Sequence, residues 1–202
     1  MQLIERLIIS VLIFILIFTV IEIKGQEIID EPDTSNISFL YMGMGFGFNN
    51  YEGLIGAGFE MPFFRRISVF GSGGLGSWGY KAGGGLCVYL KRTLLGSAFN
   101  LGYSHSFGEK GFATEMEVTG SQVPEDVILD MYATGTLNFC YSYSWPLGNK
   151  GKFSLGGGYA LPREKKPYKV MNDVELTDSS EFMMNFLSPG GPVIYFKFMF
   201  GL

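Results

Sequence analysis

The last ten residues of the chain, 193–202, alternate strictly between two kinds of side chain. A repeat of two indicates a β-strand, because successive side chains of a strand point to opposite faces. A strand with one wholly apolar face either buries that face in a protein core or turns it to lipid. The apolar face carries Ile194, Phe196, Phe198, Phe200 and Leu202, and the other face carries Tyr195, Lys197, Met199 and Gly201.

The start of the chain has the pattern of a secretory signal peptide. Arg6 precedes an apolar stretch at residues 7–21, which is shorter than the roughly 20 residues that a helix needs to cross a bilayer. Small Gly25 follows within a few residues, which suits a cleavage site. We therefore expect a cleaved signal peptide at 1–25, a short periplasmic segment at 26–36, and one domain at 37–202. An uncleaved membrane anchor is the alternative interpretation of the same stretch.

The composition restricts the class of protein. Charged residues make up 17% of the chain, against about 25% in typical soluble proteins. Glycine is abundant, with 29 residues, and aromatic residues reach 16%. The formal charge of −4 offers no electrostatic basis for binding nucleic acid. Two cysteines are too few for a disulfide scaffold.

Eight segments are predicted to be strands. Seven of them have one large apolar face and one small face, and the glycine-rich segment at 67–78 has no clear facing. In the segment at 127–145, Leu129, Leu137 and Phe139 oppose Asp130 and Asn138. Small, weakly polar side chains suit the interior of a narrow barrel, and the large apolar face then turns to lipid. We predict an all-β fold, an eight-stranded up-and-down antiparallel transmembrane β-barrel. The eight segments are 37–48, 53–61, 67–78, 82–91, 94–107, 127–145, 152–161 and 193–202.

The connections between these segments support the strand count. The long connections, at 108–126 and 162–192, follow the fifth and seventh strands and so fall at the same end of the barrel. Outer-membrane barrels place long loops outside and short turns in the periplasm. We expect the basic residues in and beside the short turns to meet anionic headgroups. These residues are Arg65, Arg66, Lys91, Arg92, Lys150 and Lys152.

Together these features resemble the small outer-membrane β-barrel (porin-like) family of Gram-negative bacteria. The resemblance is carried by the apolar start, the glycine- and aromatic-rich alternating strands, and the terminal run from Ile194 to Phe200. It implies a location in the cell outer membrane, with outer-membrane lipids and the barrel-assembly machinery as partners. In that family the last strand carries the assembly signal and usually ends in an aromatic residue, whereas this chain ends Phe200-Gly201-Leu202.

A charged and polar network is expected inside the barrel. Glu60 and Lys197 are both predicted to face the lumen, where an unpaired charge is costly, so we expect an ion pair between them. Asn100, Thr134 and Asn138 extend this interior polar network. An interior filled in this way leaves no open pore.

The two cysteines, Cys87 and Cys140, fall on the inner faces of strands that are not neighbours. A disulfide requires Cα atoms within about 7 Å. We therefore expect two free, buried thiols.

A dinucleotide-binding fingerprint is excluded. Residues 71–76, GSGGLG, fit the pattern G-x-G-x-x-G. That fingerprint needs a following helix and an acidic residue about 20 positions later. Here a glycine-rich hairpin follows, and no acid stands near residues 91–96.

His105 is the single histidine and suggests an alternative function. It lies between Ser104 and Ser106 near the predicted outer rim, and Glu109, Glu115 or Glu117 could orient it. Some outer-membrane lipid-modifying hydrolases use a rim His and Ser in this way, although their His-x-Ser spacing is absent here because Phe107 occupies that position. The leading interpretation assigns no enzymatic activity, no cofactor and no metal.

A short helix is predicted within the last long loop. Asp178 to Glu181 has the spacing of a capping box, and the sequence SPGG at 188–191 ends the helix. We expect the helix to pack on the barrel rim and bury Phe182, Met183 and Phe186. A ligand-binding lid is the alternative interpretation.

The sequence as a whole predicts a structural or surface-interaction role. The loops at 108–126 and 162–192 would meet an extracellular ligand that the sequence does not specify. Besides the hydrolase, a secreted lipocalin-like barrel that holds a ligand inside remains an alternative.

Overall fold

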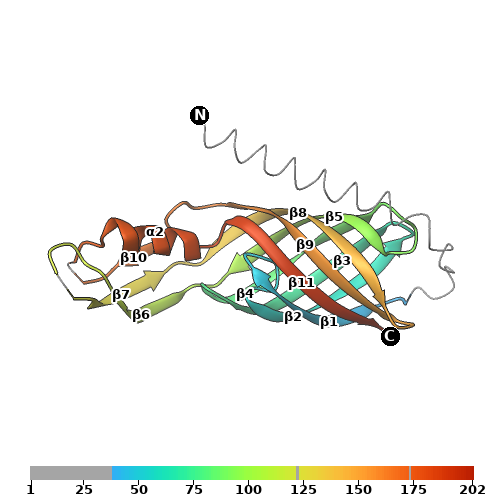
Figure 1. The fold of residues 1–202 in the computed structure, drawn as a ribbon, viewed down its shortest axis with the longest axis horizontal. Helices are drawn as coiled ribbons and strands as arrows, with labels where there is room; N and C mark the ends of the chain where they lie inside the picture. Colours follow the sequence, from blue (N-terminus) through green and yellow to red (C-terminus); the bar gives the residue numbers. More distant parts are fainter. Residues whose placement is uncertain (1–37, 122, 173) are drawn as a thin grey trace, which may run out of the picture. The chain divides into compact units, whose positions relative to one another are not determined.

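Eight strands close into an antiparallel barrel in the computed structural model, which describes residues 38–121, 123–172 and 174–202 (Figure 1). Around the barrel each strand pairs with the next barrel strand along the chain, and the last closes on the first, so the topology is up-and-down. The predicted eight-stranded antiparallel barrel is confirmed. The barrel strands are β1 (Tyr41–Phe48), β2 (Ile55–Phe64), β3 (Ile67–Gly76), β4 (Gly79–Tyr89), β5 (Gly96–Ser106), β8 (Thr134–Leu147), β9 (Gly151–Pro162) and β11 (Gly191–Gly201).

The predicted signal peptide at 1–25 and the segment at 26–36 lie outside the described residues. Within the described residues, no helix is long and apolar enough to cross a membrane.

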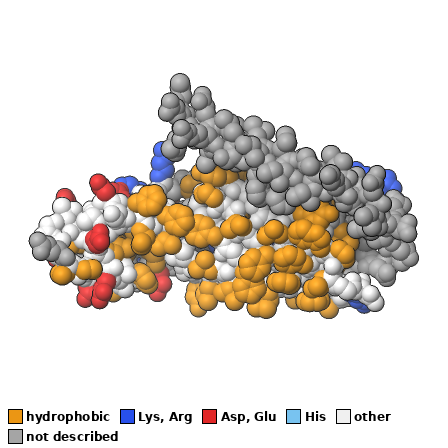
Figure 2. Space-filling model, in the orientation of Figure 1, with side chains coloured by type: hydrophobic (Ala, Val, Ile, Leu, Met, Phe, Trp, Pro, Cys, Tyr) orange, Lys and Arg blue, Asp and Glu red, His pale blue; other side chains and the backbone are white. Residues whose placement is uncertain are grey.

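Most of the large apolar side chains of the barrel point outward, whereas Phe70 and Met199 are buried inside. Leu101 and Phe139 are each 47% exposed, whereas Asn138, between Leu137 and Phe139 on the same strand, is fully buried. Figure 2 shows these apolar side chains spread over the barrel wall. We call this set the apolar belt. Its members include Met42, Met44, Ile55, Phe59, Met61, Leu75, Leu86, Val88, Phe99, Leu101, Leu137, Phe139, Leu161, Ile194, Phe196, Phe198 and Phe200.

Both long connections leave from one end of the barrel. The connections β5–β8 and β9–β11 join the same end as the connections β1–β2 and β3–β4, because neighbouring barrel strands are antiparallel. The connections β2–β3, β4–β5 and β8–β9 lie at the other end and are short. The predicted segregation of long and short connections is therefore confirmed.

The long connections fold into a second layer that the sequence did not predict. They contain β6 (Glu109–Met116), β7 (Glu125–Met131), β10 (Tyr168–Val170) and α2 (Asp178–Leu187), and the three strands form a sheet in the order β10-β7-β6. We call residues 107–133 and 163–190 the cap. The predicted single strand at 127–145 is wrong, since it is divided between β7 of the cap and β8 of the barrel. Both parts alternate with period two, so the pattern alone does not reveal the break at Tyr132.

The cap has its own apolar core, anchored to the barrel by Trp78 in the β3–β4 connection. Trp78 is 2% exposed and clusters with Leu129 and Met184. Its indole Nε1 donates a hydrogen bond to the Tyr132 carbonyl at 3.3 Å. Its ring meets Tyr168 edge-on, with centroids 6.2 Å apart. The cap therefore packs on the barrel mouth instead of forming separate loops.

Helix α2 forms where the sequence predicts it, but it buries a different face. The Thr177 side chain caps its first turn by accepting a hydrogen bond from the Ser180 N–H. The buried positions are Ser180 and Met184, four residues apart on the side that meets the cap core. The prediction that Phe182, Met183 and Phe186 are buried is wrong: they are 72%, 57% and 55% exposed.

Close backbone approach inside the barrel makes some glycines obligatory. A Cβ at Gly85 would overlap the Leu101 carbonyl on the neighbouring strand, which is backbone and has no freedom to rotate away. We expect Gly85→Ala to lower the free energy of unfolding by about 1–3 kcal/mol, as overpacking does. Urea titration of the protein in detergent micelles measures this change.

Gly73→Ala on β3 is the matched control. Its Cβ would meet nothing closer than the Lys81 carbonyl at 3.6 Å. Its expected effect is neutral or slightly stabilising, because alanine lowers the entropy of the unfolded chain. Equal losses for the two variants would contradict the close-approach argument.

Candidate functional site: the barrel lumen and its mouth

The connection between β1 and β2 folds into the lumen. We call residues 49–54 the lumen loop; within it, Asn50, Tyr51 and Glu52 are at most 2% exposed. The Tyr51 hydroxyl donates to the Asn138 carbonyl at 3.1 Å, and its ring packs edge-on against Phe70 at 4.6 Å. A short polar connection normally stays in water, so the sequence contained no clear signal for this inward fold.

Glu60 lies in a buried hydrogen-bonded ion pair with Lys152. The Lys152 ammonium is 2.8 Å from the Glu60 carboxylate. The hydroxyls of Tyr89 and Ser68 also donate to that carboxylate, at 2.7 and 2.6 Å. The Lys152 ammonium donates in addition to the Tyr89 hydroxyl at 2.8 Å. These contacts provide the partners that a buried charge requires.

Lys197 forms a second ion pair, with Glu52 of the lumen loop. The two charged groups are 2.7 Å apart, and the Asn50 side-chain amide donates to the Glu52 carboxylate at 3.1 Å. The Lys197 ammonium also lies over the Tyr195 ring, 5.1 Å from its centroid, which is favourable for a cation. This pair ties the lumen loop to the last strand of the barrel.

The predicted ion pair between Glu60 and Lys197 is therefore wrong. Both residues face the lumen, but the strand register separates them: Tyr41 on β1 stands opposite Glu60 on one side and opposite Gly201 on the other. Glu60 is thus level with Gly201, four residues from Lys197 along β11. At about 3.3 Å per residue this is roughly 13 Å. The prediction that both side chains face the lumen is correct. Their relative height along the barrel depends on strand register, which the alternation pattern does not contain.

The other predicted members of the network differ in their contacts. The Asn100 side chain donates to Ser142 at 2.9 Å and to the Tyr195 hydroxyl at 3.2 Å. Asn138 accepts a hydrogen bond from the Thr136 hydroxyl at 2.8 Å. Thr134 is buried, and its hydroxyl has no hydrogen-bond partner among the described residues. The network is therefore divided into local groups, each centred on different strands.

The space left in the lumen is small. A cavity lined by Glu52, Glu60, Asn100, Tyr195 and Lys197, among others, has a volume of about 20 Å³. This is room for about one water molecule, whereas ligand pockets typically measure about 300–1,000 Å³. The cavity does not favour the lipocalin-like alternative.

His105 and its neighbouring serines point in opposite directions. Ser104 and Ser106 are 1% and 3% exposed, and the Ser104 hydroxyl is engaged with that of Thr136 at 2.8 Å. His105 faces outward, with its ring 5.1 Å from the Phe107 ring. The structure thus does not bring His105 together with either serine.

The acids considered for the same site, Glu109, Glu115 and Glu117, are exposed on β6 of the cap or just after it. Within the described part of the chain, no cluster of three or more side chains could hold a metal ion.

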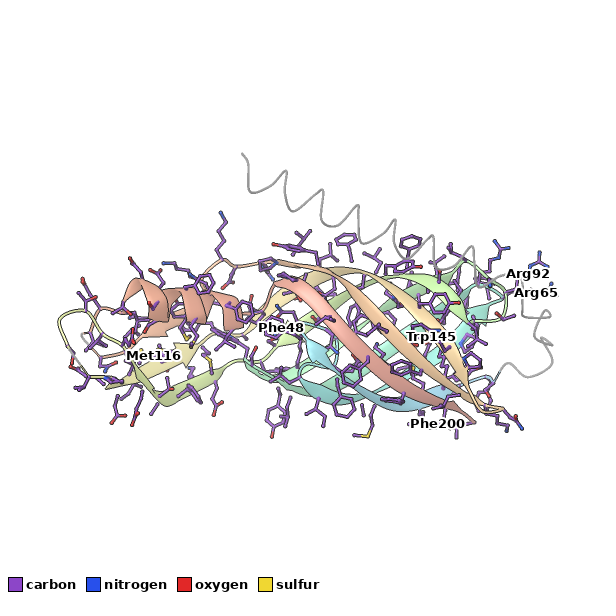
Figure 3. All side chains as sticks on the ribbon, viewed as in Figure 1. Phe48, Arg65, Arg92, Met116, Trp145 and Phe200 are labelled. Atoms are coloured by element: carbon purple, nitrogen blue, oxygen red, sulfur yellow. The ribbon has the colours of Figure 1, made fainter. Side chains whose placement is uncertain are left out.

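Basic residues gather at the end with the short turns. Arg65, Arg66, Lys91, Arg92 and Lys150 are all exposed, and Figure 3 shows Arg65 and Arg92 at the end remote from Met116 of the cap. Lys152 is the exception, because it is 2% exposed inside the lumen. The expectation that Lys152 meets headgroups is wrong: it alternates with outward-facing Phe153, so period two turns it inward.

The cap carries the opposite charge. Residues 107–133 and 163–190 contain eleven acidic and five basic side chains, and Figure 2 shows acidic side chains concentrated on the cap. Among the basic ones, Lys166 pairs with Glu181 of α2, and this hydrogen bond raises the pKa of Lys166 above its ordinary value. The exposed charges of the domain are thus divided between its two ends.

Cys87 and Cys140 are free and buried, as the sequence predicts. β5 lies between their strands in the barrel wall.

Comparison with protein-family models, curated proteins and solved structures finds no match to this chain. The functional argument therefore depends on the fold and on the geometry described above.

The observed pairing predicts strong energetic coupling between Glu60 and Lys152. Removing one partner of a buried pair costs about 3–5 kcal/mol, because the other charge is left uncompensated. We expect Glu60→Gln and Lys152→Met each to be strongly destabilising, and the double variant to lose much less than the sum. Double-mutant cycles on unfolding free energies measure this coupling.

The cycle between Glu60→Gln and Lys197→Met is the control. We expect these two changes to be additive within about 0.5 kcal/mol, since the residues have different partners. Strong coupling in this control cycle, and none between positions 60 and 152, would overturn the assignment.

Proposed function

We propose that this chain is an outer-membrane β-barrel protein without an open pore, with a structural or surface-interaction role carried by its cap. The observation that supports this most directly is the outward apolar belt around a polar, filled lumen. A water-soluble barrel turns its large apolar side chains inward and its polar ones to water. A transmembrane barrel has the reverse arrangement, because its outer solvent is hydrocarbon.

The exposed charges support an orientation for the barrel. Arg65, Arg66, Lys91, Arg92 and Lys150 surround the short turns, and the acidic cap occupies the opposite end. Short turns of outer-membrane barrels face the periplasm and long loops face outward. The basic turns then meet anionic headgroups of the inner leaflet, and the cap extends from the cell surface.

The role proposed for the cap follows from its construction. The loops at 108–126 and 162–192 carry β6, β10 and α2, which share a buried core with β7 and Trp78. A rigid platform of this kind is suited to contact a partner outside the cell. Outer-membrane lipids and the barrel-assembly machinery are the partners that the barrel itself requires. We propose no catalytic reaction, cofactor or metal for it.

Matched arginine substitutions test membrane insertion. Leu101 on β5 and Ile128 on β7 are 47% and 43% exposed, so a water-soluble protein would tolerate Leu101→Arg and Ile128→Arg equally well. In a bilayer, arginine near the midplane costs about 2–4 kcal/mol. We expect a loss of this size for Leu101→Arg and little change for Ile128→Arg, measured by urea unfolding in phosphatidylcholine vesicles. Equal small losses would refute membrane insertion.

Fractionation of the native chain provides a direct complement. In a Gram-negative host we expect the protein in the outer-membrane fraction, with gel mobility that changes on heating. Recovery as a soluble periplasmic or secreted protein would be evidence for the lipocalin-like alternative.

Epitope tags at two comparable turns test the orientation. Gly120 in the cap and Gly148 in the β8–β9 turn both have positive φ and no atoms near the position of a Cβ. We expect a tag inserted at Gly120 to bind antibody on intact cells, and a tag at Gly148 to bind only after the outer membrane is permeabilised. The opposite result would invert the proposed topology.

A further inference from the structure

Helix α2 presents two apolar faces in different directions. Ser180 and Met184 turn to the cap core, and a separate strip formed by Phe182, Met183 and Phe186 is exposed. At 3.6 residues per turn these three side chains fall within about a quarter to a third of the helix circumference. Large apolar side chains gathered in this way on a surface call for an apolar neighbour.

This exposed strip continues the apolar belt. The Phe186 ring stacks on Phe48, with centroids 5.0 Å apart and planes inclined by 19°. Phe48 ends β1 and stands opposite Ile194 of β11 in the barrel wall, and Ile194 is 61% exposed. Two residues along the same pair of strands, the rings of Phe46 and Phe196 also stack, with centroids 5.4 Å apart. The apolar surface thus runs without interruption from the β1–β11 wall onto α2.

The level of the strip matches the headgroup layer of a bilayer. The carboxyl end of α2 is held at the barrel mouth, where the Ser77 hydroxyl donates to the Leu187 carbonyl at 2.8 Å. Phe182 lies four residues before Phe186, which is about 6 Å of helix. The headgroup region on each side of the hydrocarbon core is about 5–8 Å thick. Aromatic side chains are enriched in this layer.

A short basic segment lies beside the same helix. Arg163, Lys165 and Lys166 are exposed and outnumber the one acid among them, Glu164. The Arg163 N–H donates to the Gly135 carbonyl at 2.9 Å, near the start of β8. Lys166 is joined to Glu181 of α2. Cations at the barrel rim are placed to meet lipid phosphates, whereas an apolar protein partner would have no use for them.

We propose that the exposed face of α2 is a lipid contact: Phe182, Met183 and Phe186 insert into the outer headgroup layer beside β1 and β11, and the segment 163–166 binds lipid phosphate groups there. This inference rests on the proposed membrane location and goes beyond it. It gives part of the cap a membrane-anchoring role and leaves the cap sheet free for partners outside the cell.

Spin labels on the full chain, reconstituted in vesicles of phosphatidylcholine and phosphatidylglycerol, test the contact. In a Cys87→Ala, Cys140→Ala background, one label is placed by Phe182→Cys and its matched control by Ile128→Cys, an exposed apolar position on β7 of the cap sheet. A third label, by Leu101→Cys, reports on the barrel wall. The measurement is the ratio of accessibility to oxygen, which enriches in lipid, over accessibility to a water-soluble nickel complex.

We expect this ratio to be several-fold higher for Phe182→Cys than for Ile128→Cys, and highest for Leu101→Cys. A high ratio at the barrel reporter together with equal, low ratios at the two cap positions overturns the α2 contact and leaves the proposed function intact. A low ratio at the barrel reporter overturns the proposed function itself. Spin–spin broadening for Phe182→Cys that grows with the protein-to-lipid ratio would identify a second copy as the occupant and overturn the lipid contact.

A second comparison tests the basic segment. We expect phosphatidylglycerol, relative to phosphatidylcholine alone, to raise the ratio for Phe182→Cys. Adding Lys165→Gln and Lys166→Gln should remove this dependence, and adding Lys110→Gln, on β6 of the cap sheet, should preserve it. Loss of the dependence with Lys110→Gln, or no dependence in the parent protein, overturns the phosphate contact.

Discussion

The narrow interior of an eight-stranded barrel is the constraint on which the rest of this structure depends. Eight tilted strands enclose a space just wide enough for side chains, so every inward position must be small or must find a partner. Glycine accepts the closest approaches, as at Gly85, where a Cβ would overlap the neighbouring strand. The charged groups that enter are paired: Glu60 with Lys152, and Glu52 with Lys197. The remaining cavity, about 20 Å³, holds little more than one water molecule.

The same constraint explains the outer surface. Because the lumen has room for only a few large side chains, most phenylalanine, leucine and methionine residues of the barrel strands stand on the outside of the wall. In water this surface would be a strong driving force for aggregation; in a bilayer it is the favourable solvent-facing surface. The filled lumen and the apolar belt therefore both follow from the alternation of inward and outward side chains along each strand. Together they support the proposed membrane location.

The mouth of the barrel is where this chain departs from a plain barrel. Trp78, in the β3–β4 connection, packs in an apolar core together with side chains of β7 and α2. This core converts two long connections into a folded layer whose sheet carries the acidic surface. The lumen loop closes the same mouth from within, through Tyr51 and Glu52. In the proposed outer-membrane location, contact with the outside would depend on the cap, and the loop and the ion pairs would oppose passage through the barrel.

The sequence by itself determined the properties that follow from periodicity. Alternation predicted eight barrel strands, the sixth of them merged with β7 of the cap. It also predicted the outward facing of residues such as Phe139, the inward facing of Glu60 and Lys197, and the end from which the long connections leave. Capping chemistry placed the helix at 178–187. These are local properties, since period two and helix termini depend on residues close together in the chain.

The tertiary structure decided which residues meet. Register set Glu60 about four residues away from the level of Lys197 along β11, and the lumen loop supplied Glu52 as the partner of Lys197. The division of 127–145 between cap and barrel, the pairing of Lys152 with Glu60, and the face of α2 that is buried also depend on contacts between distant segments. Alternation shows which side of a strand a residue occupies. It contains no information on the register between that strand and its neighbours, which decides which residues stand opposite each other.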